Sequence, residues 1–120
     1  MSQEPWHGRR GALVLVSAPG DYGKPRPALI VQSDFFNPTH ASIAVRLLSS
    51  DRQNAPLFRV DIEPTPENGL QKPSQIMLDK IVALKRERLG DVIGRIDESQ
   101  LLQVNRLLAV FLGLADTTKQ

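Results

Sequence analysis

Arg26 is the residue whose surroundings in the sequence most favour a chemical role. It stands between Pro25 and Pro27, where a loop rich in proline and glycine meets an apolar segment. Prolines restrict the backbone, and they would therefore hold the guanidinium in a narrow range of directions. A planar guanidinium can bind a phosphate through two parallel hydrogen bonds. These residues predict a phosphate contact at Arg26, while a solvated arginine in a proline-rich loop remains the alternative.

A short polar run follows the third apolar segment of the chain. Ser49, Ser50 and Asp51 come directly after the segment 43–48. At the end of a strand, serine hydroxyls can bind a phosphate or take part in a proton relay. The same three residues are common in ordinary turns, so composition alone leaves both readings open.

Asp79 interrupts an otherwise apolar stretch between segments 76–78 and 81–82. A carboxylate at such a position must face solvent or be paired with a donor. One reading places Asp79 on the solvent side of a strand. The other makes it a carboxylate that orients Arg26 or binds substrate.

The sequence offers few alternatives to chemistry centred on an arginine. It contains no cysteine, and its two histidines are His7 and His40. A mechanism with two histidines would need His7 from a segment without regular pattern, so we do not favour it. There is no phosphate-binding glycine loop, dinucleotide fingerprint, metal motif or nucleophile elbow. We therefore expect no cofactor and no metal site.

The size and charge of the chain predict one globular domain. With 120 residues, 41% of them hydrophobic and 23% charged, the sequence can bury one core. We expect a flexible tail over 1–10, a domain over 11–115 and a short tail over 116–120. The net charge of +2 permits a nucleic-acid partner without demanding one. Eight basic residues could line a phosphate track: Lys24, Arg46, Arg52, Lys72, Lys80, Lys85, Arg86 and Arg88.

The order of apolar segments predicts a β-rich fold followed by a helix. Short apolar runs between turn residues indicate strands, and alternation at Phe58, Val60 and Ile62 indicates a sheet with one wet face. The expected strands cover 12–16, 28–32, 43–48, 58–63, 75–84 and 92–96.

The C-terminal segment has helical rather than alternating spacing. Apolar residues recur from Leu101 to Leu112, Asp97 and Gln100 form a potential capping box, and Gly113 could end the helix. Several short strands followed by one helix suggest a small, strongly curved β-barrel closed by that helix. No apolar run approaches the roughly 20 residues that span a bilayer. We therefore expect a soluble cytoplasmic protein that does not bind a membrane.

Taken together, these motifs resemble the MazF/PemK family of toxins. The resemblance lies in the segment 23–34 around Arg26, preceded by 10–14, and continues through the strand ending in Ser49-Ser50. It extends over 69–81, with Ser74, Gln75 and Asp79, and then over 88–90 and 112–114. It covers roughly residues 10 to 114.

The resemblance implies an SH3-like β-barrel with a C-terminal helix and a homodimer. It also implies metal-independent, sequence-specific cleavage of single-stranded mRNA by a type II toxin, and inhibition by an acidic antitoxin. The family's arginine falls on Arg26, its Thr-Ser pair on Ser49-Ser50, and an acidic position of some members on Asp79.

From the resemblance and the charges we expect Arg26, Ser49 and Asp79 to be catalytic. Lys24, Ser50, Gln75 and Lys80 are expected to bind RNA. The sequence departs from the family pattern in two ways. Serine replaces threonine at position 49, and the loop 17–24 lacks the family's glutamate-glutamine element.

Two other functions are compatible with a small basic barrel. A CcdB-like toxin would bind gyrase, and an SH3-like module would bind nucleic acid without cleaving it. Arg26 between its prolines and the serine pair favour the nuclease. The end of the chain, 114–120, offers only Leu114 as an anchor for a gyrase binder.

Overall fold

Six strands and one α-helix make up the part of the chain that the computed structural model describes, residues 8–20 and 24–116. The elements are β1 (Ala12–Val16), β2 (Arg26–Ile30), β3 (Ser42–Ser49), β4 (Arg59–Ile62), β5 (Ser74–Lys85), η1 (Arg86–Arg88), β6 (Leu89–Arg95) and α1 (Glu98–Phe111). The element η1 is a 3-10 helix that joins β5 to β6. Residues 1–7 of the expected N-terminal tail, and 117–120 at the other end, lie outside the described residues.

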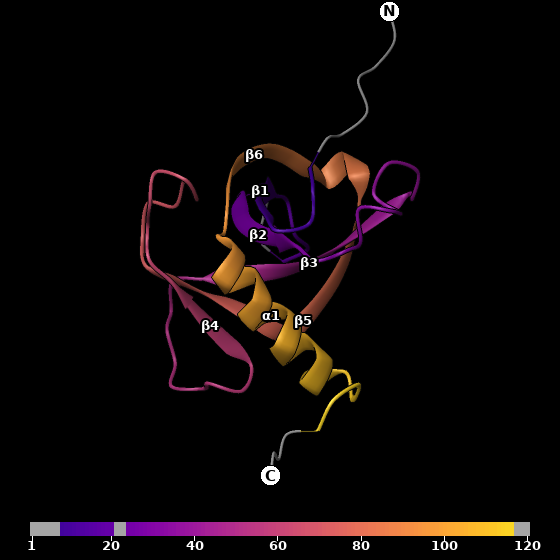
Figure 1. Cartoon of the computed structure of the whole chain (residues 1–120). Coiled ribbons are helices and arrows are strands. Elements are labelled where there is room, and N and C mark those ends of the chain that lie inside the picture. Colours follow the sequence, from indigo (N-terminus) through magenta and orange to yellow (C-terminus); the bar gives the residue numbers. More distant parts are fainter. Residues whose placement is uncertain (1–7, 21–23, 117–120) are drawn as a thin grey trace, which may run out of the picture.

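The strands form one antiparallel sheet in the order β4-β5-β3-β2-β1-β6. Side chains alternate between its two faces, and each face has its own apolar cluster. Leu13 and Leu29 face each other in one cluster with Val104 and Leu108 of α1. Val14 and its partner Ala28 belong to the other cluster. Figure 1 shows α1 lying across the sheet at β5.

The prediction of a mainly β fold with one terminal helix is confirmed. The ladder itself is open, since β4 and β6 are its edges and no pairing joins them among the described residues. A loop bridges part of this gap, because the amide of Arg95 donates to the carbonyl of Glu67 at 2.9 Å. A Cβ at Gly94 would lie only 2.3 Å from that same carbonyl oxygen. The absence of a side chain at Gly94 therefore permits the loop after β4 to approach β6.

The strand 28–32 was predicted two residues too late, because β2 covers Arg26–Ile30. Pro27 suggested a break, but the proline φ is compatible with an extended strand, and Pro27 pairs in register with Leu15. At the other end, the side chain of Gln32 bonds the carbonyl of Ser42 and the amide of Ala44. The Val31 amide still donates to the Ala44 carbonyl, but the Gln32 side chain takes over the next bonds, and β2 ends at Ile30.

The last strand and the helix also differ from their predictions. β6 begins at Leu89, where the backbone pairs with Val16 of β1. The prediction placed its start at residue 92, because Gly90 and Asp91 interrupt the apolar pattern of the sequence. Register shifts between β1 and β6 add curvature here. The capping box is confirmed: the Asp97 carboxylate accepts from the Gln100 amide at 2.7 Å, and the Gln100 side chain accepts from the Asp97 amide. Phe111 and Leu112, the last residues of the apolar spacing in the sequence, are 43% and 51% exposed, whereas Val104 and Leu108 are buried.

Candidate active site

A cavity of about 460 Å³ opens beside the start of β2. Its wall combines apolar side chains from the sheet with two cations, and none of the described residues that line it is acidic. The lining residues are Leu15, Pro25, Arg26, Pro27, Leu48, Ser50, Gly69, Leu70, Gln71, Lys72, Ser74 and Ile93. We call this cavity the Arg26 cleft. Its charge suits an anionic ligand.

Arg26 is positioned by the strand that it begins. It pairs with Val16 of β1, and its Nη2 donates to the carbonyl oxygen of Leu48 at 2.9 Å. This bond ties the guanidinium to the end of β3, and the side chain is half-buried. A guanidinium held in this way at the wall of a cleft loses less entropy when it binds a phosphate.

The serine pair at the end of β3 divides between two positions. Ser50 lines the Arg26 cleft, whereas Ser49 is not among its lining residues. The Ser49 hydroxyl accepts from the amide of Asp51 at 3.0 Å, which is the hydrogen bond of a serine turn. The structure thus places the Ser49 hydroxyl within the turn that carries Ser50 to the cleft.

The segment 69–74 supplies cleft residues that the sequence analysis did not assign to the site. Lys72 and Gln71 are exposed at the wall, and Ser74 is buried there with its hydroxyl donating to the Lys72 carbonyl at 2.9 Å. Lys72 was one of eight candidates for a phosphate track, and no spacing in the sequence distinguished it. The position of Lys72 depends on the fold of the loop before β5. This loop ends at Pro73, and β5 begins at Ser74.

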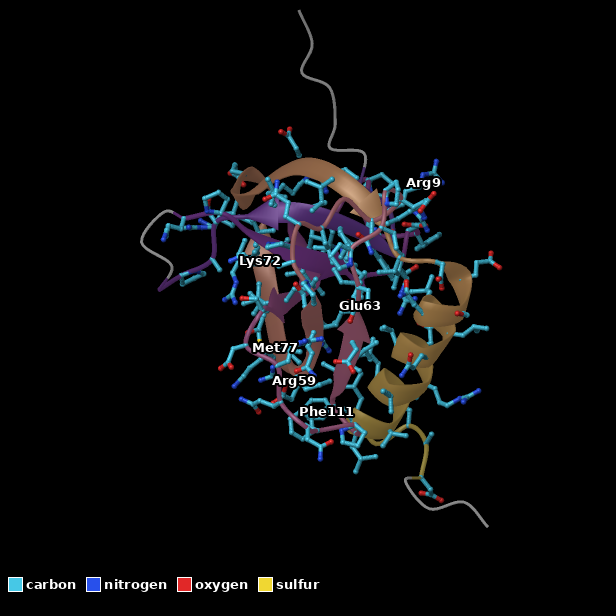
Figure 2. All side chains as sticks on the ribbon, turned by 90° about the vertical axis from the view of Figure 1, so that its left-hand side faces the viewer. Arg9, Arg59, Glu63, Lys72, Met77 and Phe111 are labelled. Carbon is cyan, nitrogen blue, oxygen red and sulfur yellow. The ribbon has the colours of Figure 1, made fainter. Side chains whose placement is uncertain are left out.

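Gln75 lies at a different place, a polar cavity of about 260 Å³ between β4, β5 and α1. Its amide group donates to the carbonyl of Gln53 and the carboxylate of Asp61, both at 2.8 Å. Its oxygen accepts from the amide of Gln53 at 2.9 Å and from Arg59 at 3.3 Å. Gln75 therefore fastens the loop before β4 to the sheet. Figure 2 shows Arg59, beside this second cavity, well apart from Lys72 at the cleft.

The other predicted site residues lie outside the lining of the cleft. Asp79 is half-buried on β5, and its Oδ1 is buried without a hydrogen-bond donor among the described groups. Lys80 is exposed next to it, and Lys24 is exposed just before Arg26. The structure therefore brings Arg26, Ser50 and Lys72 together, and it separates Gln75 and Asp79 from them.

One member of the proposed phosphate track is not a surface residue. Arg46 is buried in β3, and its Nε donates to the carbonyl of Leu78 at 2.9 Å. Burial lowers the pKa of this guanidinium, because the charged form loses contact with water. The bond lies where β3 and β5 shift register, between Arg46 and Leu48. We conclude that Arg46 stabilises this irregular part of the sheet and is not part of a phosphate track.

The described residues, 8–20 and 24–116, show neither a metal-binding cluster nor a membrane-spanning helix. No three histidine, cysteine, aspartate or glutamate side chains gather there in a way that could hold a metal ion. No helix in the same ranges is long and apolar enough to cross a membrane.

The fold and the cleft define a class: a small antiparallel β protein with one C-terminal helix and a basic cleft at the start of its second strand. Residues 9–112 match the family of PemK-like, MazF-like toxins of type II toxin-antitoxin systems. The chain belongs to this family. The resemblance noted in the sequence is therefore confirmed.

Individual relatives agree with the family. A probable endoribonuclease MazF from Mycolicibacterium smegmatis is 44% identical over 108 residues, which are 89% of this chain and 98% of that protein. The endoribonuclease EndoA of Bacillus subtilis is 29% identical, over 80% and 83% of the two chains.

Solved structures share the fold. A mycobacterial endoribonuclease in complex with its cognate antitoxin superposes with a TM-score of 0.77 and 24% identity, over 91% of this chain and 98% of that one. A chain of a MazE–MazF structure from Deinococcus radiodurans gives a TM-score of 0.75 and 20% identity, with 92% and 99% covered.

Proposed function

We propose that this chain is a toxin that cleaves single-stranded mRNA at defined sequences, without a metal ion and with Arg26 at the reacting phosphate. The activity class, a MazF-type toxin endoribonuclease, follows from the family and from the relatives named endoribonucleases. The observation that carries the residue assignment is the basic cleft beside β2, with a tethered arginine in its wall. Metal independence and specificity for mRNA are expectations that come from the resemblance.

In RNA cleavage, the contribution best suited to Arg26 is stabilisation of the negative charge on the reacting phosphate. Cleavage through the ribose 2′-hydroxyl needs a proton acceptor, a proton donor for the leaving 5′-oxygen, and stabilisation of the phosphate between them. An arginine side chain stays protonated near neutral pH and is therefore a poor base there. We assign to Arg26 the stabilisation of the phosphate, and proton donation to the leaving oxygen as a second role.

The residues around Arg26 have different roles in this proposal. Ser50 and Lys72 bind the RNA strand from the wall of the cleft. Ser49 acts at the end of β3, where its hydroxyl organises the turn beside the phosphate. Lys24 and Lys80 attract the RNA through charge. Gln75 and Asp79 lie outside the lining of the cleft.

Partners follow from the same charges. An acidic antitoxin segment would occupy a basic cleft for the same electrostatic reason that RNA does. A mycobacterial neighbour of this fold has been solved with its cognate antitoxin, and a Deinococcus neighbour as MazE–MazF. We further propose that the protein is a homodimer and that it works in the cytoplasm, the compartment of its mRNA substrate.

The architecture is proposed to be an SH3-like barrel. Support comes from the curvature caused by the register shifts between β1 and β6 and from the Arg95–Glu67 bond, which links the two ends of the open ladder through a loop. The helix α1 covers one end of the apolar cluster that includes Val104.

The test is cleavage of purified RNA in the presence of EDTA. We expect cuts at one short sequence, with a 2′,3′-cyclic phosphate or its hydrolysis product on one fragment and a 5′-hydroxyl on the other. Sequencing of the fragment ends gives the target. Loss of activity in EDTA that magnesium restores would contradict metal independence. Inhibition of gyrase without RNA cleavage would support the CcdB-like alternative, and RNA binding without any cleavage would support the non-catalytic module.

A further inference from the structure

Two phenylalanine rings are presented to solvent on the loop between β2 and β3. Phe35 is 82% exposed and Phe36 is 48% exposed. Their ring centroids are 5.1 Å apart with an interplanar angle of 88°, and the Phe36 ring meets the His40 ring at 6.1 Å. An edge-to-face pair of this kind leaves an aromatic face free for another ring.

The loop that carries these rings is held by its own hydrogen bonds. Asn37 is 3% exposed, and its side-chain amide donates to the carbonyl of Gln32 and to the carboxylate of Asp34. The amides of Phe36 and Asn37 donate to the carbonyl of Ser33 at 3.0 and 3.2 Å. The backbone that presents the two exposed rings is therefore held by these bonds, which reduces the entropy cost of ordering the loop when a partner binds.

Cations of η1 lie against the same loop. Nη1 of Arg86 donates to the carbonyls of Asn37 and His40, and the Arg86 amide donates to the carbonyl of Ala41 at 3.2 Å. Figure 1 shows η1 beside the loop between β2 and β3. Within the described segments 33–41 and 85–88, the acidic groups are Asp34, which accepts from the amides of Arg10 and Asn37, and Glu87 of η1. Arg10, Lys85, Arg86 and Arg88 outnumber these two carboxylates.

The segment η1 also connects this surface to the side of the molecule that carries Arg26. Nη1 of Arg88 donates to the carbonyl of Ser17, and the amide of Ser17 donates to the carbonyl of Arg88 at 3.0 Å. Ser17 follows Val16, the residue that pairs with Arg26. Basic side chains thus extend from the aromatic loop toward the strand end at which the cleft begins.

We propose that Phe35, Phe36 and the cations of η1 form a second RNA-binding surface, on which bases of the substrate strand stack outside the cleft. We call it the aromatic platform. The proposal rests on RNA as substrate and adds a place where nucleotides flanking the cut are held. Exposed aromatic rings beside positive charge are the combination by which proteins bind single-stranded nucleic acid without reading its sequence. The platform would raise affinity for long RNA without changing the cleavage sequence.

The first test compares substitutions at Phe35, a side chain so exposed that its replacement should leave the fold intact. Phe35→Ala and Phe35→Leu should each bind a long single-stranded RNA about tenfold more weakly, and Phe35→Tyr should bind like the wild type. Leucine is the decisive control, because it keeps an apolar surface and removes the aromatic face. Cleavage of a minimal RNA limited to the target sequence should be unchanged in all three variants.

A second test reports stacking directly and needs no cleavage. Trp6 is the sole tryptophan of the sequence, so Phe35→Trp in a Trp6→Phe background places a single fluorescent indole on the platform. Oligoadenylate RNA should quench this indole. The control is Leu57→Trp in the same background, an exposed site on another loop, which should be quenched little.

The outcomes separate this inference from the proposed function. If RNA is cleaved but the platform indole is not quenched and Phe35→Leu binds long RNA like the wild type, the platform is wrong and the nuclease stands. If oligoadenylate quenches the platform indole and no RNA is cleaved, the platform stands and the nuclease assignment fails. A Phe35→Ala variant that loses antitoxin binding and keeps RNA binding would make the surface a protein-binding site and overturn the inference.

Discussion

Arg26 is the residue on which the proposed chemistry depends, and its geometry makes that dependence testable. Its guanidinium is tethered to the Leu48 carbonyl while the side chain lines the cleft. A lysine at this position would keep the charge and lose the planar pair of donors. Charge and geometry can therefore be separated by one substitution.

We expect Arg26→Lys to slow single-turnover cleavage by about 10²-fold or more, because the developing phosphate charge loses its paired donors. Affinity for a non-cleavable RNA should change only a few-fold. Arg106→Lys on the exposed face of α1 serves as a matched control and should leave both quantities unchanged. Cleavage by Arg26→Lys at the wild-type rate would refute the assignment of Arg26.

The serine pair provides a second prediction at this scale. Ser50→Ala removes a hydroxyl from the cleft wall and should weaken RNA binding by about fivefold, the value of one hydrogen bond of about 1 kcal/mol. Ser49→Ala removes the hydrogen bond from the Asp51 amide, and the loss of one such bond, about 1.4 kcal/mol, should slow cleavage by about tenfold with smaller effects on binding.

Ser49→Thr is the control, since it keeps the hydroxyl and should restore most of the rate. Circular dichroism must show that each variant is folded. A Ser49→Ala variant with normal cleavage would remove Ser49 from the active site.

At the scale of elements, β6 and the loop after β4 depend on a close approach that only glycine permits. A Cβ at position 94 would lie 2.3 to 2.6 Å from backbone atoms of Glu67 and Asn68. Asn68 is itself buried, and its side-chain oxygen accepts from the amides of Thr65 and Leu70. The loop therefore has little freedom to move away.

Gly94→Ala should lower the free energy of unfolding by about 1–3 kcal/mol, as overpacking does. Urea denaturation measures this loss. Gly90→Ala on the same strand meets only the Leu15 carbonyl oxygen, at 3.3 Å, and should cost less. Equal stability of the two variants would show that contact between the loop and β6 does not hold the ends of the sheet together.

At the scale of the whole molecule, exposed apolar side chains indicate a further interface. Phe111 at the end of α1 and Leu112 and Leu114 directly after it are between 43% and 79% exposed, and they follow one another closely in the chain. Large apolar side chains left in water are typical of surfaces that another chain covers. A second copy of this chain is the partner that we propose.

Light scattering should therefore report about twice the chain mass of 13.3 kDa at micromolar concentration. The double variant Leu112→Glu and Leu114→Glu should shift the population toward the monomer, because charge would be buried in the contact. Leu57→Glu, an exposed change on another loop, is the control. A wild-type monomer would contradict the proposal, and a dimer that survives the double variant would place the contact elsewhere.

Local sequence patterns determined most of the elements of this protein. Periodicity of two or of 3.6 residues depends only on which side chains must leave water, so it located the strands and α1, and the Asp97–Gln100 box marked where the helix begins. The family motif predicted a role for Arg26, and the structure places this residue in the wall of the cleft. Strand ends were less accurate, because at Gln32 a side chain takes over the backbone hydrogen bonds that would otherwise extend β2.

Only the tertiary structure decided which polar residues share the cleft. Lys72 and Gln75 are three positions apart in sequence, yet one lines the Arg26 cleft and the other fastens the loop before β4. Arg46, one of eight basic candidates, is buried against Leu78. These positions depend on the register of the sheet and on the path of the loops, which are set by packing between segments far apart in the chain. The spacing of residues within one segment does not determine either of these.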